Sequence, residues 1–211
     1  MTKAAVIVGA GRQGRNVVDI FGAGPGPPIA GYLDDTRPPG TVVDRHPILA
    51  GFGRMADRAF VRDHVWIVAL GDNVIRQALC LRLADHGADF VNAIHASAFI
   101  SDFATVGRGV FINAYTRVGS GARIRDWALI EGLTWVGCDV DFGEAARCGP
   151  NCVFAGGASV GECTFVGSGG VISNEVRVGA HCVVAANAAV VRDLPDSVRA
   201  QGLPARVVLS A

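Results

Sequence analysis

Residues 129–148 read LIEGLTWVGCDVDFGEAARC, and a large apolar residue recurs in them at every sixth position. The same phase runs without a slip through a longer stretch of the chain. Its members, all apolar, are Ile94, Ile100, Val106, Ile112, Val118, Ile124, Ile130, Val136, Phe142, Cys148, Phe154, Val160, Val166, Ile172, Val178, Val184 and Val190. Because half of the chain is apolar, a run of this length arises by chance about once in 10⁵ sequences. The period is therefore a structural repeat.

A second register accompanies the first. Four residues after each large apolar residue from Ile94 to Val184 stands Ala, Val, Thr, Cys or Gly, and a glycine often follows the large residue directly, as at Gly143 and Gly161. A six-residue period is typical of three short strands per triangular coil, with the large residue inside and the small one near a corner. Such coils stack through parallel backbone hydrogen bonds and depend on one another. We expect a left-handed parallel β-helix with a C-terminal tail over residues 93–211.

Residues 1–92 carry an α/β pattern instead. Strands are predicted over 4–8, 29–33 and 66–70, with helices over 15–21 and 74–86. A glycine-rich turn follows the first strand, where backbone N–H groups at a helix N-terminus can receive a phosphate. We predict a small Rossmann-like domain that binds the nucleotide of an acceptor. The candidate binding residues are Gly9, Gly11, Arg12, Gln13, Gly14, Asp34, Asp35, Asp72 and Asn73.

The turn itself reads GAGRQG and leaves three interpretations open. Taken alone, GxGxxG favours NAD. About ninety residues hold only half of a dinucleotide fold, so a mononucleotide, as in a nucleotide-sugar, fits better. The third interpretation is a structural turn that binds nothing.

Composition excludes several classes of protein. The net charge is zero, and no block of Lys and Arg offers a nucleic-acid surface. No segment has the roughly 20 apolar residues that a membrane span needs, and the N-terminus lacks a signal-peptide pattern. The six cysteines lack zinc-type spacing, which favours buried thiols in a reducing cytosol. We expect a cytoplasmic protein without a metal, membrane or nucleic-acid partner.

The order of these parts resembles the bacterial sugar O/N-acyltransferase family with hexapeptide repeats, which includes sialic-acid O-acetyltransferases and the UDP-amino-sugar N-acetyltransferases of bacillosamine synthesis. The resemblance rests on the turn from Gly9 to Gly14, Leu33-Asp34-Asp35, Gly71-Asp72-Asn73 with Arg76, Ile94-His95, and Gly202-Leu203-Pro204-Ala205-Arg206. It implies a homotrimer that transfers an acyl group from acetyl-CoA or another acyl-CoA to an amino or hydroxyl group of a small-molecule acceptor. The implied acyl-CoA-binding residues are Arg147, Gly156, Gly157, Ala186 and Arg206.

The resemblance also implies a catalytic histidine, followed by an acid, that deprotonates the acceptor. This sequence departs there. Aligning the hexads places Cys138 at the histidine and Asp139 at its acidic neighbour, while a second family histidine falls on Arg147 and a third on Gln13. The other histidines do not obviously compensate: His95 opens the first coil, and His181 is expected on a different edge of the prism from Cys138.

Three hypotheses follow for Cys138. It is a nucleophile that carries the acyl group as a thioester, which requires a lowered thiol pKa. Alternatively, the enzyme transfers the acyl group directly, without a side-chain base, to an acceptor that is already a free nucleophile, with backbone N–H groups near Gly156 and Gly157 binding the carbonyl oxygen. In the third, the protein is a catalytically silent binding or scaffold trimer of the same fold.

Overall fold

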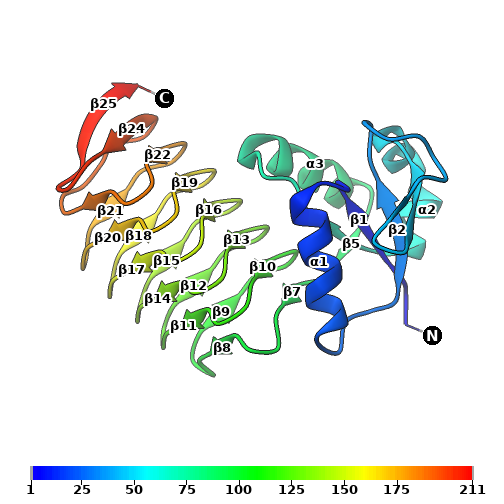
Figure 1. The fold of residues 1–211 in the computed structure, drawn as a ribbon, viewed down its shortest axis with the longest axis horizontal. Helices are drawn as coiled ribbons and strands as arrows, with labels where there is room; N and C mark the ends of the chain where they lie inside the picture. The colour runs from blue at the N-terminus through cyan, green and yellow to red at the C-terminus, as the bar shows by residue number, and fades with distance from the viewer. Residues whose placement is uncertain (1, 211) are drawn as a thin grey trace. The chain divides into compact units, whose positions relative to one another are not determined.

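The computed structural model describes residues 2–210, which divide into two compact units, one ending at Ala93 and the other beginning at Ile94. Figure 1 shows the chain from the N-terminal strands and helices to the stacked coils of the second unit. Within the described residues, no helix is both long enough and apolar enough to cross a bilayer.

The first unit is an α/β sheet. Its strands pair in the order β3 (Val42–Val43), β4 (His46–Ala50), β2 (Ile29–Leu33), β1 (Ala5–Val8), β5 (Val65–Val68) and β6 (Asp89–Phe90). All neighbours are parallel except β3 and β4. The connecting helices are α1 (Arg12–Gly22), the 3-10 turn η1 (Phe52–Ala56), α2 (Arg58–Asp63) and α3 (Asn73–Asp85). Because parallel strands end on one side, the segments after β1, β2 and β5 meet at one edge.

The second unit is the predicted left-handed β-helix, with three faces of two-residue strands. Face 1 contains β7 (Ala93–Ile94), β10 (Phe111–Ile112), β13 (Leu129–Ile130), β16 (Arg147–Cys148), β19 (Phe165–Val166) and β22 (Val183–Val184), and the hairpin β24 (Val198–Gln201) and β25 (Arg206–Ser210) closes it. Face 2 contains β8 (Phe99–Ile100), β11 (Arg117–Val118), β14 (Trp135–Val136), β17 (Val153–Phe154), β20 (Val171–Ile172) and β23 (Ala189–Val190). Face 3 contains β9 (Thr105–Val106), β12 (Arg123–Ile124), β15 (Asp141–Phe142), β18 (Ser159–Val160) and β21 (Arg177–Val178).

Each two-residue strand has an inside and an outside. The second residue points into the lumen, and from Ile112 onward these side chains belong to one buried core, in which the rings of Phe142 and Phe154 meet edge to face at 5.2 Å between centroids. The first residue points outward, as Arg123, Asp141 and Arg177 do on face 3. The six-residue period predicted this alternation, since every strand must bury the same phase of the repeat.

The chain passes from face 1 to face 2, then to face 3 and back, so it turns at three edges, named here 1–2, 2–3 and 3–1. From Gly109 to Asn187, each corner contains one residue with a left-handed backbone, which makes the turn sharp. Some corners use glycine, as at Gly121 (φ 72°) and Gly157 (φ 70°), while others force a side chain into this conformation, as at Asp139 (φ 58°) and Glu175 (φ 60°). Equivalent corner residues therefore project the same way, one coil above another.

The lumen packing is open to a direct test. Phe142→Ala removes a fully buried ring, so the free energy of unfolding should fall by about 3–5 kcal/mol. Ser159→Ala, at an outward position of the adjoining coil, should change it by less than about 0.5 kcal/mol. Chemical denaturation followed by circular dichroism measures both. Equal losses for the two variants would contradict the assignment of inward and outward residues.

Candidate functional site

The glycine turn joins β1 to α1. Gly9 has a left-handed backbone (φ 99°), and a side chain on Gly14 would overlap the carbonyl oxygen of Gly9, so the turn and the helix are in backbone contact. The helix begins at Arg12, three residues earlier than predicted, because Gly14 permits this close approach. Gly11 caps α1 without a side-chain hydrogen bond, and the first turn holds no acid. The N-terminus of α1 can therefore accept an anionic group.

The first of the two predicted acids, Asp34, uses its carboxylate for hydrogen bonds within the chain. One carboxylate oxygen accepts the N–H of Ala10 at 2.8 Å, and the other accepts the N–H of Thr36 at 2.8 Å and its hydroxyl at 2.5 Å. Burial raises the pKa of Asp34, but the hydrogen bonds from Thr36 and Ala10 outweigh it, and the pKa lies below its usual value. Asp34 thus fixes the glycine turn to the end of β2.

The second acid, Asp35, is exposed, and its Oδ1 accepts the N–H of Phe52 at 2.6 Å. Its other carboxylate oxygen makes no hydrogen bond to residues 2–210. Asp35 is therefore better placed than Asp34 to meet a ligand. Sequence reasoning did not single out Thr36 or Arg37, whose guanidinium donates to the carbonyl of Ala10; their position directly after the two acids was the available signal.

Asp72 and Asn73 stand at the start of α3. Asp72 caps the helix by accepting the N–H of Ile75 at 2.9 Å, and Asn73 accepts from Arg76 at 3.0 Å. Arg76 is only 1% exposed and also donates to the carbonyl of Leu70 at 2.8 Å. A buried guanidinium thus lies behind the end of β5, where it holds the segment after β5 to the start of α3.

Cys138 and Asp139 lie on edge 2–3 of the β-helix. Of the six cysteines, only Cys138 is exposed, and the other five are buried, as predicted. Neither the thiol of Cys138 nor the carboxylate of Asp139 has a hydrogen bond or ion pair within residues 2–210. The next coil of the same edge holds Gly156 and Gly157, and the N–H of Gly157 donates to the carbonyl of Cys138 at 2.9 Å. The structure therefore brings together four of the predicted residues.

The other predicted acyl-CoA residues lie elsewhere on the chain. Arg147 is on face 1, with its guanidinium carbon 4.9 Å from the centroid of the Phe165 ring. Ala186 is exposed on edge 1–2, and Arg206 opens β25 in the tail. One chain by itself does not gather these residues beside Cys138. Their role in acyl-CoA binding stays a prediction.

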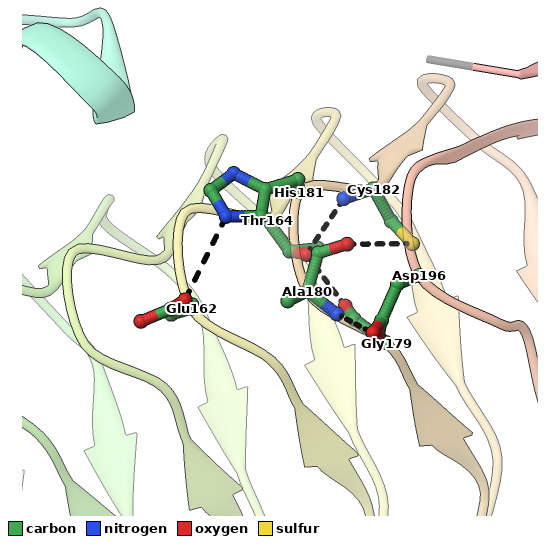
Figure 2. Close-up of polar contacts among 7 residues, drawn as sticks. All are labelled: Glu162, Thr164, Gly179, Ala180, His181, Cys182 and Asp196. Atoms are coloured by element: carbon green, nitrogen blue, oxygen red, sulfur yellow. Dashed lines mark hydrogen bonds and ion pairs between the residues drawn. The ribbon is translucent and has the colours of Figure 1, made fainter.

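His181 lies on edge 3–1, the edge that does not carry Cys138. Figure 2 shows its imidazole facing Glu162 of the preceding coil, with Nε2 at 3.6 Å from Oε1. The turn beneath it is held by Asp196, which accepts the N–H of Ala180 at 2.7 Å, and by Thr164, which donates to the carbonyl of Gly179 at 2.7 Å. His181 therefore lies on a different edge of its own chain from Cys138, the position at which the resemblance implies a histidine.

The sequence analysis did not identify Asn174 and Glu175 as candidate site residues. They lie on edge 2–3 above the glycine pair, and the N–H of Glu175 donates to the carbonyl of Gly156 at 2.9 Å. A signal existed, because they follow Cys138 and Asp139 by 36 residues, which is two coils. Within the described residues, no group of three or more His, Cys, Asp and Glu is arranged to hold a metal ion.

The chain is similar to known sugar acetyltransferases. Residues 4–83 match the family model of the PglD N-terminal domain. A UDP-N-acetylbacillosamine N-acetyltransferase from Bacillus subtilis is 30% identical over 124 residues, a match that spans 53% of this chain and only about half (52%) of the relative. A mutant of GDP-perosamine N-acetyltransferase from Caulobacter crescentus, solved with CoA and GDP-perosamine, is 36% identical with a TM-score of 0.92, covering 97% of this chain and 96% of that one.

A more distant solved structure agrees in fold. The acetyltransferase domain of PglB from Neisseria gonorrhoeae, in complex with acetyl coenzyme A, superposes with a TM-score of 0.90 at 24% identity. The superposition covers 99% of this chain and 100% of that one. At this identity the likeness concerns the fold alone.

The role of Asp34 in holding the turn predicts a pH dependence. Its folded-state pKa is lowered, so its contribution to stability is present above the unfolded value of about 4 and is lost as the pH falls through the folded value. Asp34→Asn should cost about 1–3 kcal/mol at pH 7 and flatten this acid-side slope. Unfolding between pH 7 and pH 3 measures both, with Asp35→Asn as the control. A steeper effect of the Asp35 change would contradict the assignment.

Proposed function

The chain belongs to the bacterial sugar N-acyltransferase family with hexapeptide repeats, and we propose that it transfers an acyl group, most simply acetyl, from acyl-CoA to the amine of a nucleotide-linked sugar. The observation that carries the proposal is the presence in one chain of two features: a helix N-terminus without a side-chain cap, which suits a phosphate, and a corner glycine pair on edge 2–3 (Gly156 and Gly157, named here the glycine notch). The match to GDP-perosamine N-acetyltransferase over nearly the whole chain supports both the donor and the acceptor class.

The acceptor's nucleotide is assigned to the first unit. Its phosphate meets the N-terminus of α1, whose backbone N–H groups and dipole favour an anion. The exposed carboxylate of Asp35 accepts hydrogen bonds from the base or the ribose, while Asp34 keeps the turn in place. This division predicts that Asp35 contributes to acceptor affinity and that Asp34 contributes to stability.

Acyl transfer is assigned to edge 2–3 and proceeds directly. A cysteine nucleophile requires a base or cation that stabilises its thiolate. Within residues 2–210, the thiol of Cys138 makes no hydrogen bond or ion pair with a base or a cation, and the negative charge of the neighbouring Asp139 carboxylate opposes a thiolate. The acceptor amine therefore attacks the thioester carbon itself, and Cys138 occupies the position of the family histidine without carrying the acyl group.

The acting form is proposed to be a homotrimer. On face 2, Phe99, Trp135 and Val153 are exposed, with the guanidinium of Arg117 stacked between the rings of Phe99 and Trp135 at 5.0 and 4.7 Å. An exposed apolar face of this kind favours burial against another protein surface. Association of three copies also offers a way for residues that one chain holds apart, such as Arg147 and Gly156, to share one groove.

The direct mechanism predicts the behaviour of two Cys138 variants. With GDP-perosamine, UDP-linked amino sugars and hydroxylamine as acceptors, the wild-type protein should release CoA thiol from acetyl-CoA. Cys138→Ala should keep kcat within about threefold, whereas an obligatory thioester would cost a thousandfold or more. Release of CoA thiol is followed with a thiol-reactive chromophore. A silent wild type beside an active Cys138→His would show that the fold has kept its substrates and lost its chemistry.

The trimer predicts a change in mass on mutation of face 2. Trp135→Glu places a charge in the proposed interface, so light scattering should report the mass of one chain in place of three. Val42→Glu changes an exposed apolar residue of the first unit and should leave the trimer intact. A wild type with the mass of one chain would contradict the trimer.

A further inference from the structure

The glycine notch on edge 2–3 is covered by two side chains of the next coil, Asn174 and Glu175, named here the roof. Asn174 and Glu175, one coil above the glycine pair, both fold back over it: a side-chain carbon on Gly156 would lie 3.5 Å from Nδ2 of Asn174, and one on Gly157 would lie 3.2 Å from Cγ of Glu175. Below the pair stand Cys138 and Asp139. Two strand spacings, about 9.5 Å of edge, separate the coil of Cys138 from that of Glu175.

The carboxylates of Asp139 and Glu175 occupy equivalent corner positions, but only one faces the notch. Each side chain leans on the preceding coil. Asp139 therefore lies against Gly121, where an added side-chain carbon would overlap its Oδ1, and Glu175 lies against Gly157. The left-handed backbone at both residues fixes this direction. Asp139 thus points away from the notch, and Glu175 points over it.

The groups of the roof are available to a ligand. Neither the amide of Asn174 nor the carboxylate of Glu175 makes a side-chain hydrogen bond or ion pair with any of residues 2–210. Both residues are exposed at the corner. An amide donor and a carboxylate acceptor side by side suit a reaction in which a carbonyl oxygen gains negative charge while a nitrogen loses a proton.

Resting on the proposed function, we propose that Glu175 is the proton acceptor of this enzyme, in place of the missing histidine, and that Asn174 donates a hydrogen bond to the thioester carbonyl oxygen. The acceptor nitrogen bonds to the carbonyl carbon, and the oxygen takes up the electron pair of the C=O bond. The nitrogen then gives its proton to the carboxylate of Glu175. Collapse of the intermediate re-forms C=O and breaks the C–S bond, and the CoA thiolate takes the proton from the carboxyl group of Glu175. An amide and CoA thiol result, and Glu175 is again a carboxylate.

The test compares Glu175→Gln with Glu162→Gln, a matched change on edge 3–1. With the sugar-amine acceptor that the wild type uses, Glu175→Gln should lower kcat about 10²- to 10⁴-fold and leave the KM for acetyl-CoA within about twofold. Hydroxylamine is largely uncharged at neutral pH and depends less on a base, so its rate should fall by less than about tenfold. Glu162→Gln should match the wild type with both acceptors.

Two further measurements test the roles of Asn174 and Glu175. Asn174→Ala should lower kcat about 10²-fold with either acceptor, because the carbonyl oxygen is common to both reactions. Thermal unfolding of each variant checks that the fold is intact. If the wild type turns over and Glu175→Gln keeps its kcat with the sugar amine, the assignment of Glu175 is overturned while the proposed function stands. A wild type that releases no CoA thiol with any acceptor overturns both.

Discussion

The stacking of one coil on the next is the constraint on which the second unit depends. Each strand of the stacked coils, from β7 to β23, has only two residues, so no coil completes its hydrogen bonds by itself, and each pairs with the coils above and below. This stacking demands that inward side chains recur every six residues and that the backbone turn sharply at each corner. The same demand places residues eighteen apart directly above one another. Each edge of the prism therefore carries a row of corner side chains, one set from each coil, called here the rungs of that edge.

Edge 2–3 shows how such a ladder becomes a site. The glycine pair leaves one rung without side chains at two corner positions, while the rungs above and below keep theirs. The thiol of Cys138 lies on one side of this notch, and the amide and carboxylate of Asn174 and Glu175 lie on the other. Polar side chains therefore lie on both sides of the glycine notch, and the proposed direct transfer uses the carboxylate of the rung above it.

In the first unit, the ends of the parallel strands bring the candidate residues together. Its parallel strands end at one edge, which brings the glycine turn, the acids after β2 and the start of α3 together. Several side chains there bind the protein itself: Asp34 holds the turn, and Asp72 caps α3. The surfaces left for a ligand are the N-terminus of α1 and the exposed carboxylate of Asp35.

The sequence by itself determined the architecture, because few folds are compatible with an unbroken six-residue period or with a glycine turn after a buried strand. It also placed Cys138 and Asp139 on one edge with Gly156 and Gly157, since period alone decides which residues share an edge. Only the tertiary structure decided the direction of side chains. Asp139 leans away from the notch and Glu175 leans over it because of the corner dihedral angles and the neighbouring coils. Asp34 makes its hydrogen bonds to the glycine turn because β2 ends beside that turn. No local sequence pattern specifies these directions.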